Sequence, residues 1–264
     1  MPSIRKEMRN HVAVITIDRP ESMNALDYDL NQELIRTFRE FEDDPDAYVA
    51  VLTGAGEKAF CAGADLKSYT YSYVSRSAAD FRMDYTDGPG FGAITRNFKG
   101  NKPVVAAING YCISGGLELA LATDIRFCSS NAVFALQDVN WGFHCADGGS
   151  IRLPLVVGQG NAMEMLLSGD KFNAEHAYRI GLVNRVYAPE ELLERTIEFA
   201  EKLASRAPLA QRFAKDVMHR AIGLNLDEAL RMETRSFYDL AHTQDLHEGI
   251  AAFAEKRPAA FKGE

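Results

Sequence analysis

The spacing of hydrophobic residues predicts alternating strands and helices over the first part of the chain. The runs IRKEM and VAVITID flank Arg9-Asn10 and predict a hairpin, because the second run is β-branched and alternates. Apolar residues at steps of three and four then predict an amphipathic helix that ends at Asp44-Pro45: Leu26, Leu30, Leu34, Phe38 and Phe41. The apolar runs 48–54 and 102–110 predict short strands that are buried on both faces.

The pattern weakens between those two strands and then returns. Residues 68–100 include the tyrosine-rich segment 69–73 and the turn run TDGPGFG, and we expect one or two helices with a mobile surface segment here. After Gly115-Gly116 the chain predicts a helix over LELALAT, strands over DIRFCSS and AVFAL, and a helix over SIRLPLVVG. Residues 161–186 predict a helix, a turn, a short helix and a short strand.

From Pro189 onward the pattern is helical almost to the end, over 190–206, 208–222, 226–241 and 245–256. Strands and helices followed by helices alone predict an α/β fold with a helical C-terminal region. We divide the chain into a β/α core over 1–195 and a helical region over 196–264. This tail is short for an independent domain, so we expect it to pack on its own core and on neighbouring subunits.

The composition is that of a globular protein with a sizeable core: 264 residues, 47% of them apolar and 25% charged. The net charge of −8 argues against nucleic acid as a partner, because binding it needs clustered Lys and Arg. The start MPSIRKEMRN has no secretory pattern, and no run of about 18 apolar residues is found, so we expect a cytoplasmic protein without membrane contact. The cysteines contain no C-x-x-C pair, which fits neither a zinc site nor a small disulfide framework: Cys61, Cys112, Cys128 and Cys145.

Two glycine-rich turns each follow a predicted buried strand: Gly63-Ala64-Asp65 in FCAGADLK and Ser114-Gly115-Gly116 in NGYCISGGLELA. Small residues let the backbone approach a ligand closely, and the start of a helix leaves N–H donors unpaired. One N–H from each turn, directed at the same carbonyl oxygen, would form an oxyanion hole. The alternative is that both are tight turns that need unusual backbone angles and have no catalytic role.

Four polar residues are candidates for acid–base chemistry. Glu118 lies among apolar and small residues, so its carboxylate is either desolvated with a raised pKa, bonded to a group beyond its helix, or simply exposed. Asp138 in FALQDVNWG follows a strand and is a candidate acid or an ordinary turn residue. Asp147 precedes Gly148-Gly149 and a helix, where capping is its alternative role. His144 is the histidine nearest to them, and its alternative is an incidental loop position.

Several other chemistries lack support in the sequence. It contains no G-x-S-x-G elbow, no G-x-x-x-x-G-K-[ST] loop and no H-E-x-x-H. The run GQGNAM after Val157 lacks the third glycine of a dinucleotide fingerprint and follows a predicted helix. We therefore expect neither a metal nor a hydride-transfer cofactor.

Taken together, the segments DRPESMNAL, FCAGADLK, KPVVAAINGYCISGGLELALATDIRF, GGSIRL, SGDKFNAEHAYRIGLVNRV and AFAEKRPAAFK resemble the crotonase (enoyl-CoA hydratase/isomerase) superfamily. The resemblance runs in order over essentially the whole chain. It implies a spiral of ββα units with a helical C-terminal trimerisation region, assembled as a homotrimer or a dimer of trimers. It also implies an acyl-CoA substrate, with coenzyme A as part of that substrate and no further cofactor.

The resemblance also assigns roles to individual residues. Ala64 and Gly115 match the two backbone N–H donors that bind the thioester carbonyl, and Glu118 and Asp138 match the two glutamates of the hydratases. Further positions match contacts to the coenzyme: Met23, Asn24, Ala25, Ala62, Gly63 and Leu66. Phe253 and Lys256 match tail residues that reach the ligand, in some relatives from an adjacent subunit.

The chain departs from the family pattern at several positions. Asp138 is one methylene shorter than the family's glutamate, and a displacement of about 1 Å can cost about 10²-fold in rate. Asp147 falls beside the position where dienoyl-CoA isomerases and an aryl-CoA dehalogenase carry an extra aspartate. Trp141 and the segment 69–73 would shape a pocket for a cyclic or aromatic acyl group, or would simply pack.

We therefore predict reversible hydration of a 2-enoyl-CoA to a 3-hydroxyacyl-CoA. Glu118 would activate the water and Asp138 would exchange the proton at Cα. The alternative within enzymes is another enolate reaction on the same scaffold (double-bond isomerisation, thioester hydrolysis or ring chemistry), with Asp147 as an additional catalytic group. A more remote alternative is a non-catalytic member that binds RNA or acts as a scaffold.

Overall fold

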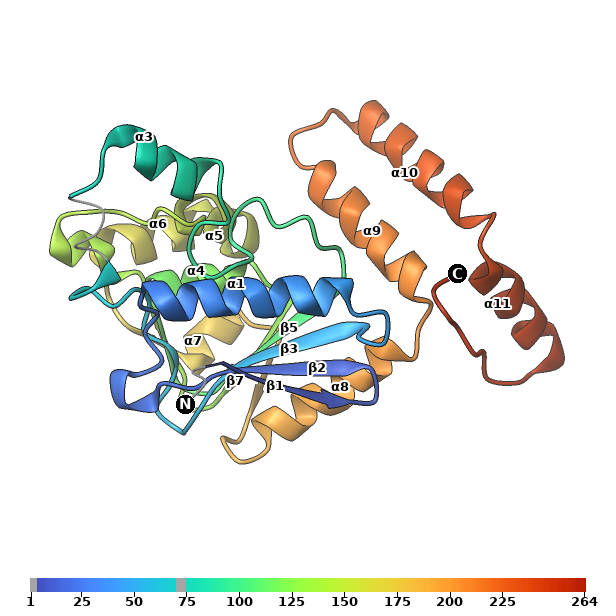
Figure 1. Cartoon of the computed structure of the whole chain (residues 1–264), viewed down its shortest axis with the longest axis horizontal. Coiled ribbons are helices and arrows are strands. Elements are labelled where there is room, and N and C mark those ends of the chain that lie inside the picture. Colours follow the sequence, from blue (N-terminus) through green and yellow to red (C-terminus); the bar gives the residue numbers. More distant parts are fainter. Residues whose placement is uncertain (1–3, 70–74) are drawn as a thin grey trace.

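The computed structural model describes residues 4–69 and 75–264, and a six-stranded sheet lies at its centre (Figure 1). In spatial order the strands are β1 Ile4–Arg9, β2 Val12–Ile17, β3 Val49–Gly54, β5 Val104–Ile108, β7 Ile125–Ser129 and β10 Arg185–Tyr187. β1 pairs antiparallel with β2, and the other neighbours are parallel. The predicted hairpin is confirmed. Its turn falls one residue later than expected, at Asn10-His11, where both φ angles are positive as in a type I′ turn.

A second, four-stranded sheet lies in the order β4 Ala59–Cys61, β6 Tyr111–Ile113, β8 Val133–Ala135 and β9 Phe172–Asn173. Consecutive strands such as β5 and β6 enter different sheets before a helix follows, which produces the spiral of ββα units. The strands β4, β6 and β9 were not predicted, because two or three residues show no period and, unlike β8, these strands do not stand out as separate apolar runs in the sequence. The two glycine-rich turns therefore follow β4 and β6, and not β3 and β5 as predicted.

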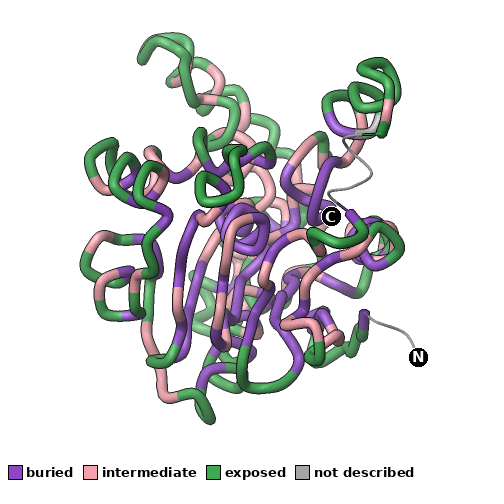
Figure 2. The backbone as a smooth tube through the Cα atoms, turned by 90° about the vertical axis from the view of Figure 1, so that its left-hand side faces the viewer, coloured by how far each residue is buried: buried purple, intermediate pink, exposed green. Residues whose placement is uncertain are grey.

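The apolar strands of the large sheet are buried on both faces, as predicted. On β2 and β3, Ile15 and Leu52 face one hydrophobic cluster, while Val14 and Val51 face the other. Helix α1, Tyr28–Asp43, covers the first face, and helix α8, Leu192–Ala204, covers the second (Figure 1). Figure 2 shows the buried stretches concentrated in these strands, with exposed chain on the helices around them.

The remaining helices of the core are η1 Pro20–Ser22, α3 Ala78–Phe81, the π-helical turn η2 Arg82–Thr86, α4 Gly115–Leu121, η3 Gln137–Trp141, α5 Gly149–Val157, α6 Gln159–Ser168 and α7 Ala174–Arg179. Helix α3 and the turn η2 supply the helical structure expected within 68–100. Tyr69 is buried, while Tyr71 and Tyr73 of the tyrosine-rich segment lie outside the described residues.

Three predicted C-terminal helices extend away from the sheet: α9 Pro208–Arg220, α10 Leu226–Leu240 and α11 Gln244–Glu255 (Figure 1). Within the described chain α10 has no buried residue, and it exposes Leu226 and Phe237. The division at residue 195 falls inside α8, which packs on the sheet, and the two-region boundary stays a prediction. No helix in residues 4–69 or 75–264 is long and apolar enough to cross a membrane.

Candidate active site

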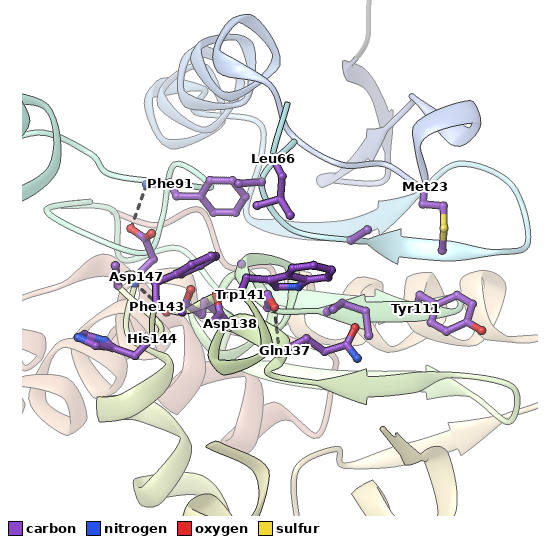
Figure 3. A pocket seen from close by; sticks show the side chains of 18 of the residues that line it. Met23, Leu66, Phe91, Tyr111, Gln137, Asp138, Trp141, Phe143, His144 and Asp147 are labelled. Atoms are coloured by element: carbon purple, nitrogen blue, oxygen red, sulfur yellow. Dashed lines mark hydrogen bonds between the residues drawn. The ribbon is translucent and has the colours of Figure 1, made fainter. Parts of the chain in front are cut away.

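A cavity of about 950 Å³ opens where the turn after β4, the start of α4, η3 and the loop 142–147 meet (Figure 3). Its size is that of a site for an organic ligand. Eleven of the residues singled out in the sequence line it: Met23, Ala62, Ala64, Leu66, Ser114, Gly115, Glu118, Asp138, Trp141, His144 and Asp147. Segments far apart in the chain thus supply one site.

The two glycine-rich turns touch each other at this cavity. β4 and β6 are parallel neighbours, so their carboxyl ends lie at the same edge of the small sheet. Gly63 has a φ of +93°, and a Cβ at this position would lie 3.0 Å from the Ile113 carbonyl oxygen and 3.1 Å from the Gly115 nitrogen. A Cβ on Gly116 would lie 2.0 Å from the Cys61 carbonyl oxygen. Glycine is required at both positions for α4 to begin this close to β4.

The close packing leaves two backbone donors unused. Gly115 is the first residue of α4, where an N–H has no acceptor within the helix. Leu26 bonds with the residues on either side of Ala64, because its N–H donates to Gly63 and its carbonyl accepts from Asp65. In the described part of the chain neither the Ala64 N–H nor the Gly115 N–H donates to a protein group. Both residues line the cavity, so their N–H groups are available to a ligand's carbonyl oxygen.

Glu118 is buried on α4, with 3% of its surface exposed, so the alternative of an exposed glutamate is wrong. Its Oε1 accepts hydrogen bonds from the Asp147 N–H at 2.7 Å and from the Gly149 N–H at 2.8 Å. Burial, together with the negative charge of Asp147, raises the pKa of Glu118 from 4.5 to about 7, although the two N–H bonds act in the opposite direction. A carboxyl group with this pKa is suited to proton transfer near neutral pH.

Asp138 lies on η3, with 5% of its surface exposed, and lines the cavity. The Cys145 thiol donates to its Oδ2 at 3.7 Å. Burial and the neighbouring carboxylates raise the pKa of the Cys145 thiol, which therefore stays protonated and acts as a donor. A Cβ on Gly149 would lie 2.9 Å from the Cys145 Sγ and 3.2 Å from the Glu118 Cγ, so this thiol lies beside both acids. No sequence signal had indicated Cys145.

Asp147 does not cap the following helix. The cap position of α5 is Gly148, with no side-chain cap bond, so the capping alternative is wrong. The Asp147 carboxylate accepts from the Phe91 N–H at 3.1 Å and pairs with Arg96 at 3.6 Å. Burial raises the pKa of Asp147, and the Phe91 N–H and the Arg96 charge oppose this shift. Because the Asp147 N–H donates to Glu118, this residue connects the segment around Phe91 to the acid on α4.

Two arginines brace the loop that carries Asp147. Arg152 donates to the carbonyl oxygens of Asp147 at 3.0 Å and Thr95 at 2.6 Å, and Arg96 donates to the Ala146 carbonyl. The Nδ1 of His144 lies 2.8 Å from the Cys145 carbonyl oxygen, and the ring lines the cavity. Hydrogen bonds to backbone carbonyl oxygens therefore hold the loop 142–147 in place. Among the described residues no group of three or more His, Cys, Asp or Glu is arranged to hold a metal.

Comparison with known proteins assigns the fold and its site to a family. The model of the enoyl-CoA hydratase/isomerase family matches residues 7–264. The chain belongs to this family. It is 40% identical to carnitinyl-CoA dehydratase of Proteus mirabilis, over 99% of this chain and 98% of that one. It is also 40% identical to (E)-benzylidenesuccinyl-CoA hydratase of Thauera aromatica, over 97% and 98%.

A solved structure of this family supports the same conclusion. Enoyl-CoA hydratase from Bacillus anthracis superimposes with a TM-score of 0.89 at 34% identity, covering 99% of this chain and 100% of that one. The predicted crotonase superfamily and its α/β fold are therefore confirmed. The chain is an enzyme, a lyase of the enoyl-CoA hydratase type.

The residues that crotonase relatives suggest for coenzyme contact fall into two groups. Met23, Ala62 and Leu66 line the cavity. Asn24 is fully buried, where its side chain accepts from the Arg19 N–H and donates to the carbonyl oxygens of Ala55 and Ala59. Asn24 therefore braces the turn itself, and neither it nor its neighbour Ala25 lines this cavity.

The tail residues lie elsewhere in the crotonase fold. Phe253 and Lys256 are at the end of α11, and Phe253 has 88% of its surface exposed. Neither lines the cavity of its own chain, because α9, α10 and α11 lead the tail away from the core (Figure 1). A single chain therefore does not bring them to the predicted ligand.

The sequence analysis missed several side chains that line the crotonase cavity: Phe81, Tyr85, Phe91, Tyr111, Phe143 and Lys171. The Lys171 ammonium lies 5.4 Å from the centre of the Tyr111 ring. Phe91 follows a glycine with positive φ in the run TDGPGFG, which had been interpreted as a turn alone. A local pattern does not show which turn residues face a cavity.

Proposed function

We propose that this enzyme catalyses the reversible addition of water to a 2-enoyl-CoA, which gives a 3-hydroxyacyl-CoA. The proposal depends mainly on one observation: Glu118 and Asp138 are buried at the same cavity as the unused N–H groups of Ala64 and Gly115. Hydration of an enoyl thioester needs a donor pair for the carbonyl oxygen and two groups that exchange protons at Cβ and Cα. The site offers each of these in one place.

The steps follow from the charges that develop. The thioester oxygen accepts from the Ala64 and Gly115 N–H groups, and each donor is worth about 3–4 kcal/mol as that oxygen becomes enolate-like. The Glu118 carboxylate takes one proton from water as the oxygen bonds to Cβ. Asp138 passes a proton from solvent to Cα, so one water molecule is added overall. Exchange with solvent then restores the protonation states of both acids.

The role of Asp147 favours hydration over the other enolate reactions. Its carboxylate is already engaged by the Phe91 N–H and the Arg96 guanidinium, so it is not a free base at the substrate. The short side chain of Asp138 accepts a hydrogen bond from Cys145, which would hold the carboxylate in one orientation. In this scheme the coenzyme is part of the substrate, and no further cofactor takes part.

Product analysis in heavy water tests the proposal. With crotonyl-CoA as substrate, we expect 3-hydroxybutanoyl-CoA that carries one deuterium at Cα, detected by mass spectrometry. The label arises because the acid that protonates Cα exchanges with solvent. A product with a shifted double bond, or a free acid, would replace hydration with isomerisation or thioester hydrolysis.

The pH dependence of the reaction should report on Glu118. We expect kcat/KM for hydration to rise with pH through a limb near 7, because Glu118 must be ionised to accept the proton and its pKa is raised to about 7. The Asp147→Asn variant should move this limb to lower pH, since the charge of Asp147 is one cause of the raised pKa. The plateau rate should change far less than in a variant of Glu118 itself. Rate profiles at constant ionic strength measure both effects, and an unmoved limb would contradict this coupling.

We also propose a homotrimer or a dimer of trimers in the cytoplasm. Helix α10 leaves its apolar side chains exposed, so a neighbouring subunit would cover them. Phe253 and Lys256 lie away from the cavity of their own chain, so they would contact the acyl-CoA bound in the cavity of a neighbouring subunit. The four cysteines are free and buried, which suits a reducing compartment. Light scattering coupled to size-exclusion chromatography measures the assembly.

A further inference from the structure

Beyond the two acids the cavity is walled by aromatic side chains from separate segments. Phe81 and Tyr85 come from α3 and η2, Phe91 comes from the following loop, and Trp141 and Phe143 come from the end of η3 and the residues after it. Figure 3 shows Phe91, Trp141 and Phe143 gathered around Asp138, with Met23 and Tyr111 at the opposite end of the cavity. These three aromatic side chains therefore surround Asp138, and Met23 and Tyr111 lie farther along the cavity.

One wall of this end is rigid and lies against a proposed oxyanion donor. A Cβ on Gly115 would lie 2.7 Å from the Phe91 ring, so that ring directly adjoins the turn that carries the Gly115 N–H. The Phe91 backbone is held by Asp147, and its ring meets Tyr69 edge-on at 5.6 Å between centroids. An acyl chain whose carbonyl is bound at this turn would pass along the Phe91 ring.

The opposite wall consists of aromatic rings with open surface. Phe143 has 41% of its surface exposed, and Trp141 is more exposed still, although both line the cavity. Phe81, which is partly exposed, stacks on the buried Tyr85 at 4.8 Å with an interplanar angle of 3°, and both line the cavity. Exposed aromatic surface that faces a cavity is typical of a ligand site. A planar ring would fit here in stacked or edge-on contact with these side chains.

The charges argue against an anionic acyl group. Among the described lining residues the ionised groups at this end are acids, while Lys171 lies beside Tyr111 at the far end. An anionic acyl group would therefore face Glu118 and Asp138, and no lysine or arginine among the described lining residues of this end would pair with it. Asp147 is already paired with Arg96, whereas Glu118 and Asp138 would attract a cation, and aromatic rings also bind quaternary ammonium groups. A binding test therefore has to compare a planar ring with a quaternary ammonium directly.

We propose that the acyl group of the substrate carries a neutral aromatic ring at or near Cβ. The ring would lie between Phe91 on one side and Trp141 and Phe143 on the other. The inference rests on the proposed hydratase function for the placement of the thioester carbonyl and of Cβ. It deepens that proposal by naming the class of substrate, an aryl-substituted 2-enoyl-CoA.

Binding of saturated analogues tests the pocket separately from the chemistry, because these thioesters cannot be hydrated. We would measure the Kd of 3-phenylpropanoyl-CoA, 3-cyclohexylpropanoyl-CoA, octanoyl-CoA and 4-trimethylammoniobutanoyl-CoA by calorimetry. The phenyl compound should bind about tenfold more tightly than the octanoyl compound and several-fold more tightly than the cyclohexyl compound. Equal or tighter binding of octanoyl-CoA, or tightest binding of the quaternary ammonium, would overturn the proposal.

Substitutions of Phe143 test whether this wall of the cavity is responsible for the preference for an aryl acyl group. Phe143→Ala and the milder Phe143→Leu should weaken binding of 3-phenylpropanoyl-CoA by up to about tenfold and that of butanoyl-CoA by less than about twofold. Tyr178→Ala is the matched control, because Tyr178 is an exposed aromatic residue on α7 outside the cavity, and it should change neither affinity. An equal loss for both ligands would mean that Phe143 has a merely structural role and would refute the proposal.

Turnover separates this inference from the hydratase proposal. The kcat/KM for cinnamoyl-CoA should exceed that for crotonyl-CoA, and Phe143→Ala should reduce the ratio. Hydration of crotonyl-CoA without any preference for the aryl substrate would remove the inference and leave the hydratase function standing. Tight binding of the phenyl analogue without hydration of either enoyl thioester would support the aryl-binding pocket and contradict the hydratase function.

Discussion

Glu118→Gln should lower kcat for enoyl-CoA hydration by about 10²–10⁴-fold while the fold is retained. The amide has the shape of the carboxylate, and its oxygen still accepts from the Asp147 and Gly149 N–H groups. It cannot take a proton from water, so the loss belongs to the chemical step and KM should change little. Steady-state kinetics with crotonyl-CoA, or with cinnamoyl-CoA where that is the better substrate, measures the effect. Glu164→Gln on the exposed face of α6 is the matched control and should retain wild-type turnover.

The same variant has a consequence for stability that separates proton transfer from structure. Burial raises the pKa of Glu118 from 4.5 to about 7, so the folded state holds this proton more tightly than the unfolded state does. Ionisation therefore opposes folding as pH rises from 4.5 to 7, by about 3 kcal/mol once both states are ionised. Glu118→Gln removes that term, so its stability relative to wild type should be greater at pH 8 than at pH 5. Urea unfolding at the two pH values measures this, and an identical difference at both would contradict the raised pKa. Wild-type turnover in the variant would contradict its catalytic role.

The helices and strands whose apolar pattern extends over many residues were predictable from the sequence. Four of the five apolar positions that predicted the first helix lie in α1, while Leu26 precedes it and forms a β-bridge with Ala64. The four C-terminal helical segments span several turns each, and each became a helix. The nearly all-apolar runs of β3 and β5 indicated burial on both faces, and the two hydrophobic clusters explain why. The strands β4 and β6 were not predictable, because three residues carry no measurable alternation.

The site was predictable where local surroundings decide the chemistry, and not where distant segments do. Glu118 lies among apolar neighbours in the sequence, and this made desolvation one of three alternatives, which its burial and raised pKa then support. Asp147 before two glycines has the local pattern of a helix cap, but its partner is the N–H of Phe91, which is 56 positions away. The aromatic wall likewise comes from segments that meet in the folded chain alone. Propensity describes a residue's neighbours along the chain and does not describe such tertiary contacts.

Gly63→Ala should lower kcat by about 10²–10³-fold, the loss expected when one donor to a developing oxyanion is displaced. The added methyl would lie 3.0 Å from the Ile113 carbonyl oxygen and 3.1 Å from the Gly115 nitrogen, so the two turns would have to move apart. The N–H groups of Ala64 and Gly115 would then no longer converge on one oxygen. Neither acid is altered, and a pH limb that stays near 7 would show that Glu118 keeps its surroundings, so the loss would be assigned to the donor pair.

Gly158→Ala provides the control for backbone strain. Gly158 has a φ of +79°, similar to the +93° of Gly63, but a Cβ there would meet nothing within 4 Å. Both variants place alanine at a positive φ and should lose about 1–3 kcal/mol of stability for that reason. If the donor pair is catalytic, Gly63→Ala alone loses turnover, although thermal unfolding shows comparable backbone strain in the two proteins. Equal turnover in both variants would mean that the contact between the turns is structural, and the donors would then have to be sought elsewhere in the cavity.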